Sequence, residues 1–245
     1  MAEMKFVTTP LLTGVPGLAH GFGLRYDGAR AEARSAAQDA LREQGNVYFL
    51  RQVHGCAIAA PPWTEPPDAD ASWTANKGTL LAIETADCLP VLIADPVHGR
   101  VAAAHAGWRG TVAKVAREAV RTLIAAGSDP RSLLVALGPS IGPCCYEVGS
   151  DVEEGFGPEG ARFFSPGRAE RKHVDVAAAN RAQLEAEGVL PEHIEAVALC
   201  TKCRPDLFYS YRRDQANAGR MISVIGFSRT SLASASEPAS SSPSA

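Results

Sequence analysis

Short runs rich in valine, isoleucine and leucine alternate along the chain with stretches whose apolar residues recur at helical spacing. The runs are typical of β-strands and predict strands at 47–53, 79–84, 89–94, 100–105, 133–137, 194–199 and 221–227. The helical stretches predict helices at 29–43, 111–126 and 176–187. The alternation is less regular than in a doubly wound parallel sheet. The pattern therefore predicts a protein of mixed α and β structure.

Two of the predicted helices carry recognisable end signals. Thr111 is placed to cap the helix at 111–126, and Gly127 is placed to end it. Asp175 is the candidate cap of the helix at 176–187, with Gly188 just beyond its end. These signals fix the expected boundaries more firmly than hydrophobicity alone.

The C-terminal segment 228–245 has almost no large apolar residues. Such a segment cannot offset the entropy lost on ordering its backbone, so we expect a disordered tail after a single domain at 1–227. The start of the chain lacks the basic and continuously apolar pattern of a signal peptide, and no apolar stretch is long enough to span a membrane. We expect a cytoplasmic protein that does not associate with membranes.

The charge and cysteine content of the chain limit the classes of molecule that it is expected to bind. The 245 residues carry a formal net charge of −3, so no global positive field exists to attract nucleic acid, and an anionic small molecule needs a local basic cluster. The six cysteines of a chain kept in the cytoplasm are expected to be thiols, metal ligands or core residues rather than disulfides. The expected partner is a small-molecule substrate, and a monomer is favoured.

Three potential metal ligands lie at or beside the ends of predicted strands: His54, Cys88 and His105. Two imidazoles and one thiolate suit zinc, and three protein ligands leave the fourth tetrahedral position for a water that the metal acidifies. Each residue also has an ordinary alternative, because cysteine is often buried and an isolated histidine is often part of the core. Their long spacing matches no compact zinc motif.

The surroundings of these residues add candidate roles. In HAGWRGT, the start of the predicted helix and the guanidinium of Arg109 can receive a phosphate, although the two glycines also fit a simple tight turn. Asp87 precedes Cys88 and can orient a histidine ligand or carry a proton, or it can serve as an ordinary cap.

A second group of cysteines and an aromatic segment near the C-terminus have less specific interpretations. Cys144, Cys145, Cys200 and Cys203 could form a four-thiolate zinc site, but adjacent side chains diverge in an extended chain. The sequence therefore favours thiols that line a loop. The segment 208–220 could stack a base and pair with a phosphate, but a half-exposed strand with a solvated basic face explains it better.

Six strings taken together resemble the YfiH family, also described as laccase-domain or polyphenol oxidase proteins, peptidoglycan editing factors and purine nucleoside phosphorylases. They are RQVHG at 51–55, TADCLPV at 85–91, AAHAGWRGT at 103–111, GPSIGPCCYEV at 138–148, VDVAAANRAQL at 174–184 and FYSYRRD at 208–214. Their order and separation match from about His20 to Phe227. The start departs from the family pattern: HGFGLRYDGARAEARSA is shortened and lacks the usual asparagine-containing loops, which puts the substrate range in question.

The resemblance implies an α+β fold of four layers, α/β/β/α, with two sheets face to face and helices outside. It implies that His54, Cys88 and His105 hold Zn²⁺. It also implies phosphorolysis of adenosine, inosine, guanosine and methylthioadenosine, with adenosine deamination as a side activity. For these reactions Arg51 and Arg109 are the candidate phosphate partners. Asp87 is the candidate proton shuttle beside a zinc-activated water that attacks C6 of adenine.

Three other functions compete with this one. A copper-dependent polyphenol oxidase would use the same two histidines and cysteine, but it also needs a separate histidine-rich cluster, and only four further histidines are present. A hydrolase that edits cell-wall precursors could use Cys88 as a nucleophile with His54 or His105 as its base, or could use zinc. A purely structural or binding role fits poorly with so many polar residues at strand ends.

Overall fold

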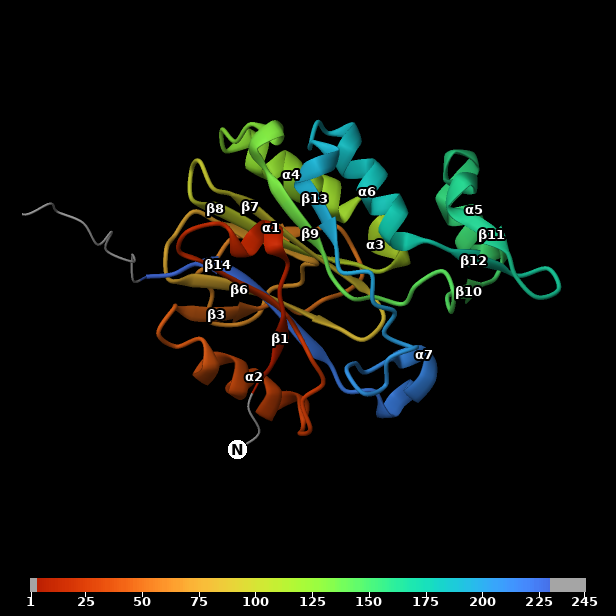
Figure 1. Cartoon of the computed structure of the whole chain (residues 1–245), viewed down its shortest axis with the longest axis horizontal. Coiled ribbons are helices and arrows are strands. Elements are labelled where there is room, and N and C mark those ends of the chain that lie inside the picture. Colours follow the sequence, from red (N-terminus) through yellow and green to blue (C-terminus); the bar gives the residue numbers. More distant parts are fainter. Residues whose placement is uncertain (1–3, 230–245) are drawn as a thin grey trace, which may run out of the picture.

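Two mixed β-sheets form the centre of the computed structural model, which describes residues 4–229 (Figure 1). The five-stranded sheet has the order β1 (Phe6–Val7), β2 (Leu18–Gly23), β14 (Met221–Phe227), β6 (Thr79–Thr85) and β3 (Asn46–Phe49). The six-stranded sheet has the order β13 (Ile194–Ala196), β9 (Leu134–Leu137), β7 (Leu89–Asp95), β8 (Arg100–Ala106), β5 (Ala71–Thr74) and β4 (Ile58–Ala59).

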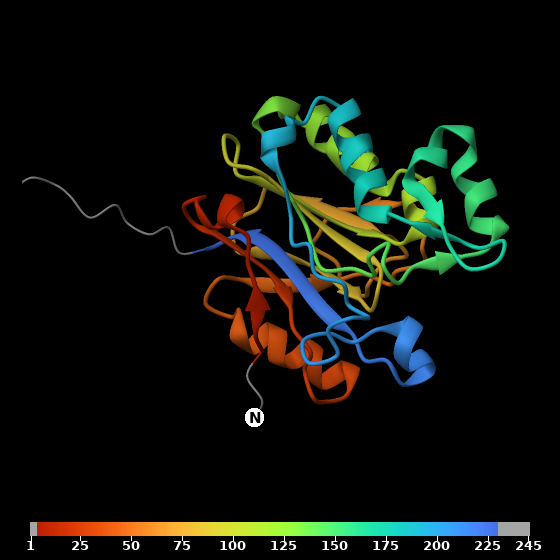
Figure 2. The ribbon, with the colours of Figure 1, turned by 45° about the vertical axis from the view of Figure 1, so that its right-hand side comes forward.

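Seven α-helices and a small third sheet complete the described part of the chain. The helices are α1 (Pro10–Thr13), α2 (Arg30–Ala40), α3 (Trp108–Val112), α4 (Val115–Ala125), α5 (Ser150–Gly160), α6 (Val176–Ala186) and α7 (Tyr211–Asp214). The three-stranded sheet has the order β10 (Glu147–Val148), β12 (Lys172–Val174) and β11 (Phe164–Pro166). Together with α5, this sheet forms a projection at one side of the molecule (Figure 2).

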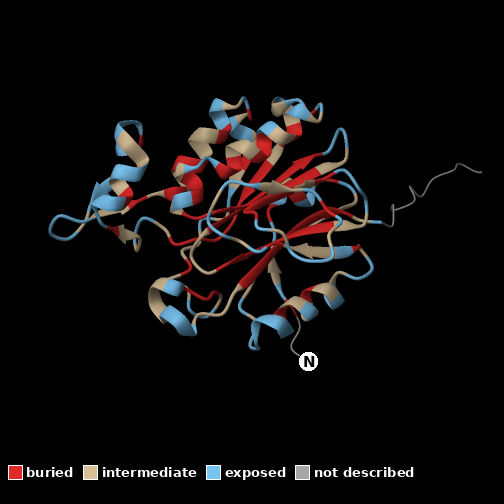
Figure 3. Cartoon of the chain, turned by 180° about the vertical axis from the view of Figure 1, so that it is seen from behind, coloured by how far each residue is buried: buried red, intermediate tan, exposed pale blue. Residues whose placement is uncertain are grey.

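The long strands have no solvent-facing side, because each of their faces packs against another layer. In β7, Leu92 and Ala94 point into the core between the two sheets, whereas Val91 and Ile93 point toward α4. Burial on both faces explains why such strands read as continuous apolar runs. Figure 3 shows this burial concentrated in the sheets and the helices exposed on their outer sides.

The arrangement has four layers, as the family resemblance implied. Helix α2 covers the outer face of the five-stranded sheet, where Ala33 and Ala37 pack with residues of β6 and β14. Helices α4 and α6 cover the outer face of the six-stranded sheet (Figure 1). The α/β/β/α prediction is confirmed.

The helix predicted at 111–126 differs from the observed structure. The chain forms α3 and α4 as separate helices, because Lys114 adopts a left-handed conformation with φ of 63°. Thr111 lies inside α3 rather than at a cap, where its buried hydroxyl accepts a hydrogen bond from Asn180 Nδ2 at 2.8 Å. The predicted stop is correct: Gly127 has φ of 97°, a value that favours glycine.

Most of the other element predictions agree with the structure, but the strand predicted at 194–199 ends at Ala196 as β13. The half-exposed strand favoured for 208–220 is wrong, because Ser210 caps α7 there and a 3-10 helix follows at Gln215–Asn217. Asp175 caps α6 by accepting a hydrogen bond from the backbone N–H of Ala178 at 2.8 Å. Strand β14 has the predicted bounds, and β3 is shorter than predicted. The predicted tail lies mostly outside the described residues. Within its first two positions, the backbone N–H of Arg229 donates to the carbonyl of Gln44 at 2.8 Å. No helix among residues 4–229 is long and apolar enough to cross a membrane.

A buried carboxylate joins α2 to the five-stranded sheet. The side chain of Glu84 is 2% exposed and accepts hydrogen bonds from the guanidinium groups of Arg30, at 2.6 and 2.8 Å, and Arg34. Burial alone would raise the pKa of Glu84, but the two arginines outweigh it and hold the pKa below its usual value. The ionised form of Glu84 therefore stabilises the folded state.

We expect Glu84→Gln to lower the free energy of unfolding by about 2 kcal/mol at neutral pH, because two arginines lose a charged hydrogen-bond partner. A group whose folded-state pKa is lowered contributes stability above its unfolded pKa and loses it as pH falls through the folded value. The difference between the two proteins should therefore shrink in acid, which urea unfolding at a series of pH values measures. Glu43→Gln is the control, since Glu43 is exposed and makes no ion pair within residues 4–229. If the difference in free energy of unfolding between Glu84→Gln and the parent chain stayed the same in acid, the stabilising role of ionised Glu84 would be contradicted.

Candidate active site

His54, Cys88 and His105 come together at one end of the two central sheets. His105 lies near the end of β8, Cys88 immediately precedes β7, and His54 follows β3. Strands β7 and β8 are antiparallel, with Pro90 opposite His105, so the start of one strand lies beside the end of the other. One donor atom from each of the three residues lies within 4.8 Å of the other two. The structure thus brings together the ligand set that the sequence proposed.

Asp70 contacts two members of this cluster, His54 and His105. Its buried carboxylate accepts hydrogen bonds from the backbone N–H groups of Val53, His54 and Gly55 at 3.1, 2.9 and 2.6 Å. The same carboxylate lies 2.8 Å from Nδ1 of His105. These contacts hold the His54 backbone, whose φ is 64°, and place the Nδ1 proton of His105 on the Asp70 side. The Nε2 atom of His105 is left free to bind a metal.

The electrostatics of the cluster favour a thiolate. Burial alone would raise the pKa of Cys88, but His105 and His54 lower it to about 6. Burial would lower the pKa of His105, whereas its hydrogen bonds to Asp70 and Cys88 raise it to about 9. Without a metal, the pair therefore favours a thiolate beside an imidazolium.

The donor chemistry of the cluster fits zinc. Two imidazole nitrogens and one thiolate sulfur are ligands that zinc commonly takes, and three protein ligands leave one tetrahedral position open. The carboxylate–histidine contact from Asp70 to His105 is the type of outer support that histidine ligands usually have. Asp70 was not identified from the sequence. Its only signal there is an acidic residue directly before a short strand.

A cavity of about 590 Å³ lies over the cluster and is lined by His54, Cys88 and His105. Its size is within the range of small-molecule sites. Its walls include the aromatic side chains of Trp108, Tyr146 and Tyr211. They also include Arg212 and Arg220, and in addition Arg30, whose guanidinium is paired with Glu84. The cavity can therefore offer flat apolar faces and positive charge to a ligand above the proposed metal position.

Asp87 lines the same cavity, but its carboxylate is already hydrogen-bonded on both oxygens. One oxygen accepts from the hydroxyl of Thr201 at 2.6 Å. The other accepts from the hydroxyl of Ser210 at 3.0 Å and from the backbone N–H of Arg212 at 2.6 Å. These contacts connect the segment before β7 to two distant loops. The proton-shuttle role predicted for Asp87 stays a prediction.

The two arginines predicted to bind phosphate lie in different places. Arg51 forms an ion pair with Asp68, and 69% of its side chain is exposed; it is not among the residues that line the cavity. Arg109 stacks on the ring of Trp108 at 4.2 Å from the ring centroid. It lines an adjoining hollow that shares Trp108, Tyr146 and Arg212 with the cavity. The geometry therefore favours Arg109 and Arg212 over Arg51 as neighbours of a bound anion.

Gly107 packs directly against the cluster. A Cβ atom at this position would lie 2.9 Å from Sγ of Cys88 and 3.5 Å from a ring carbon of His54. We expect Gly107→Ala to lower the zinc affinity of the site by about 10-fold, the lower end of the effect of disturbing the surroundings of a metal site. The backbone itself tolerates alanine, with φ of −67°.

Competition against a chromophoric chelator measures this change. Gly14→Ala is the matched control, because its Cβ would make only ordinary contacts at 3.7 Å or more and its φ is −68°. Equal zinc affinity in Gly107→Ala and the parent chain would show that Sγ of Cys88 is not confined as described.

Comparison with known proteins identifies the family. Residues 27–228 match the model of the family described as "Multi-copper polyphenol oxidoreductase laccase". The chain is 39% identical to a purine nucleoside phosphorylase of Deinococcus radiodurans, over 84% of this chain and 83% of that protein. It is 31% identical to the mouse purine nucleoside phosphorylase LACC1 over 91% of its own length, and this match spans 58% of the mouse protein.

A solved structure agrees with these relatives. The crystal structure of YlmD from Geobacillus stearothermophilus superimposes with a TM-score of 0.82 at 28% identity, covering 93% of this chain and 97% of that one. The family model covers most of the chain, and the sequence and structure matches point to the same group. The chain therefore belongs to the laccase-domain family of YfiH- and YlmD-like proteins, as its motifs indicate.

Proposed function

We propose that the protein is a zinc-dependent purine nucleoside phosphorylase acting on adenosine, inosine, guanosine and methylthioadenosine, with adenosine deaminase as a side activity. The convergence of His54, Cys88 and His105 at the base of a cavity with aromatic and basic walls carries this proposal. The names of the relatives in Deinococcus radiodurans and mouse support the purine nucleoside phosphorylase part of this proposal.

In this proposal the cavity walls bind the two substrates. Trp108, Tyr146 and Tyr211 offer flat faces on which a purine can stack. Arg109 and Arg212 supply positive charge for phosphate, and neither forms an ion pair with a carboxylate among the described residues. Holding phosphate beside the sugar converts a bimolecular displacement of the base into a reaction between positioned groups.

His54, Cys88 and His105 would hold the zinc ion, and Asp70 would orient His105 toward it. When bound, zinc supplies Lewis-acid polarisation of an oxygen and acidifies a water, the chemistry that deamination of adenosine requires. Asp87 is the proposed proton carrier for that reaction. Its hydrogen bonds from Thr201 and Ser210 come from hydroxyl groups, through which a proton can be passed.

Oxidation of phenols by copper, which the family description suggests, fits the residues less well. Two histidines and a cysteine can hold copper, but a multicopper oxidase needs a further histidine-rich cluster. All six histidines lie within residues 4–229, and no group of potential ligands in that part of the chain includes His20, His98, His173 or His193. We therefore propose zinc rather than copper.

A cysteine hydrolase, with cell-wall precursor editing as one form of it, is the second candidate. The observation that favours it is the pairing of the half-buried Cys88 thiolate with the buried His105, which also describes an activated nucleophile. Covalent labelling separates the two candidates. Rapid modification of Cys88 by a small electrophile that zinc does not slow would favour the hydrolase. Protection of Cys88 by stoichiometric zinc would favour the metal site.

The direct test is turnover of the four nucleosides by the pure, zinc-loaded chain, with and without inorganic phosphate. We expect phosphate-dependent release of the free base and a sugar 1-phosphate, and phosphate-independent conversion of adenosine to inosine. Chelation of zinc should remove the deamination, and added zinc should restore it. Failure to form free base or inosine from any nucleoside would overturn the proposal.

A further inference from the structure

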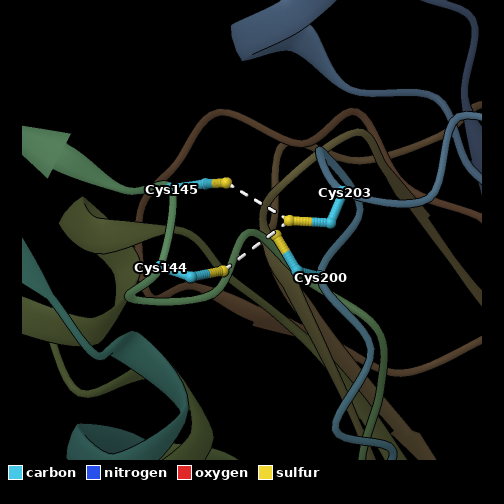
Figure 4. Close-up of side chains that lie close together, drawn as sticks. All are labelled: Cys144, Cys145, Cys200 and Cys203. Atoms are coloured by element: carbon cyan, nitrogen blue, oxygen red, sulfur yellow. Dashed lines mark hydrogen bonds between the residues drawn. The ribbon is translucent and has the colours of Figure 1, made fainter.

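A second cluster of cysteines lies apart from the candidate active site. Cys144 and Cys145 lie in the loop before β10, and Cys200 and Cys203 lie in the segment that follows β13. Figure 4 shows the four side chains directed toward one another, and all four sulfur atoms lie within 4.8 Å of each other. Sγ of Cys203 is 3.4 Å from that of Cys145 and 3.8 Å from that of Cys144.

This convergence corrects the expectation that Cys144 and Cys145 diverge. The expectation assumed an extended chain, but the two residues occupy a tight turn in which the N–H groups of Cys145 and Tyr146 both donate to the carbonyl of Gly142 at 2.9 Å. In such a turn, consecutive side chains can reach the same side. The segment that carries Cys200 and Cys203 is held beside this turn by a parallel bridge between Ser140 and Cys200.

We propose that Cys144, Cys145, Cys200 and Cys203 bind a structural zinc ion as a four-thiolate site. Zinc–sulfur bonds of about 2.3 Å in a tetrahedron place neighbouring sulfurs about 3.8 Å apart. The observed distances between sulfur atoms, from 3.4 Å up to at most 4.8 Å, lie on both sides of that value. One ion can therefore be held after small movements of the side chains. Binding transfers up to four thiol protons to solvent and leaves a centre of charge −2.

The sulfur of Cys200 already has the outer contact that a metal-bound thiolate uses. The backbone N–H of Gly142 donates a hydrogen bond to Sγ of Cys200 at 3.3 Å. Hydrogen bonds to ligand sulfurs offset their negative charge and fix their orientation. The site draws ligands from two segments about 55 residues apart, as the numbering of Cys145 and Cys200 shows. A bound ion would therefore connect two separate parts of the fold.

One of the two connected segments lines the active-site cavity, and the other holds a residue that does. Ile141 and Tyr146, on either side of the Cys144–Cys145 turn, line the cavity. Thr201, next to Cys200, donates its hydroxyl to Asp87, the residue before Cys88. A zinc ion at the four cysteines would fix the spacing between the wall at Ile141 and Tyr146 and the segment that holds Asp87, without contacting substrate. This inference does not depend on which reaction the cavity catalyses.

Metal analysis of the full chain, purified under reducing conditions, tests the proposal. We expect two zinc equivalents per chain in the parent protein, one in Cys88→Ser and one in Cys200→Ser. Cys56→Ser is the matched control and should keep two, because Cys56 is exposed and belongs to neither cluster. Unchanged zinc content in Cys200→Ser, or iron in place of zinc at this site, would overturn the proposal.

X-ray absorption at the zinc edge of Cys88→Ser gives a test that does not require Cys200→Ser to fold. The zinc that this variant keeps should show only sulfur neighbours, at about 2.3 Å. Nitrogen or oxygen in the first shell, or the absence of any zinc in folded Cys88→Ser, would overturn the proposal. A disulfide between any of the four cysteines in the chain as purified, detected by mass spectrometry, would also overturn it. Nucleoside turnover is not measured in these experiments, so they separate this inference from the proposed function.

Discussion

Replacing Cys88 by serine is expected to remove one zinc equivalent and to lower kcat/KM for nucleoside turnover by about 10³-fold. In the proposed site the Cys88 thiolate is a metal ligand, whereas a serine hydroxyl stays neutral and binds zinc weakly. The Lewis-acid contribution of a bound metal is several kcal/mol, and each 1.36 kcal/mol corresponds to a tenfold change in rate. The loss should be seen most clearly in the deamination of adenosine, for which a chemical role of zinc can be assigned.

Metal content and steady-state kinetics measured on the same samples check this prediction. His105→Ala should have the same effect on both quantities if Cys88 and His105 bind one ion. Cys56→Ser should leave both unchanged, since Cys56 lies outside both cysteine-containing clusters. A Cys88→Ser protein that keeps its full zinc content and loses only activity would identify Cys88 as a nucleophile instead. A Cys88→Ser protein that keeps both its zinc content and its activity would exclude a role for the Cys88 thiol in zinc binding and in catalysis.

The strands of the core were predictable because their pattern is local. Strand β14 is apolar at nearly every position and was predicted with its observed bounds, since both of its faces are buried. Hydrophobicity alone does not distinguish one sheet from two. That two sheets face each other was implied by the family resemblance, and residues such as Leu92 and Ile225 in the shared core confirm it.

Other features depend on contacts between distant residues, and single-sequence patterns do not contain them. The break between α3 and α4 occurs at Lys114, a residue that favours helices, so no local signal marks it. Asp70 gains its importance only because the chain brings His54 and His105 to it from different elements. The same holds for Arg212, whose position in the cavity depends on the contacts of α7 with Asp87.

The candidate metal ligands were partly predictable. Their residue types and their positions near strand ends indicated the set, but the long spacing between them gave no geometric proof. For the cluster of Cys144, Cys145, Cys200 and Cys203 the prediction was wrong in its geometry, because it treated Cys144 and Cys145 as extended. The turn that brings them together contains a glycine and a proline, Gly142 and Pro143, which are the residues that could have indicated it.

Asp70→Asn is expected to weaken zinc binding at the His54, Cys88 and His105 site by 10- to 100-fold, about the effect of removing an outer hydrogen-bond partner of a metal ligand. The amide replaces one carboxylate oxygen with an N–H donor. Whichever way the amide is turned, that donor meets N–H groups: those of Val53 and Gly55 on one side, or those of His54 and His105 on the other. The folded state should also lose about 2 kcal/mol from these unsatisfied donors.

Chelator competition and urea unfolding of the same variant measure the two effects separately. Asp68→Asn is the matched control, since Asp68 lies two residues earlier, is about half exposed and pairs with Arg51 at the surface. It should change neither zinc affinity nor stability appreciably, because exposed ion pairs contribute little. If Asp70→Asn bound zinc as tightly as the parent chain while losing stability, the carboxylate would hold only the backbone at 53–55. His105 would then reach its position without it.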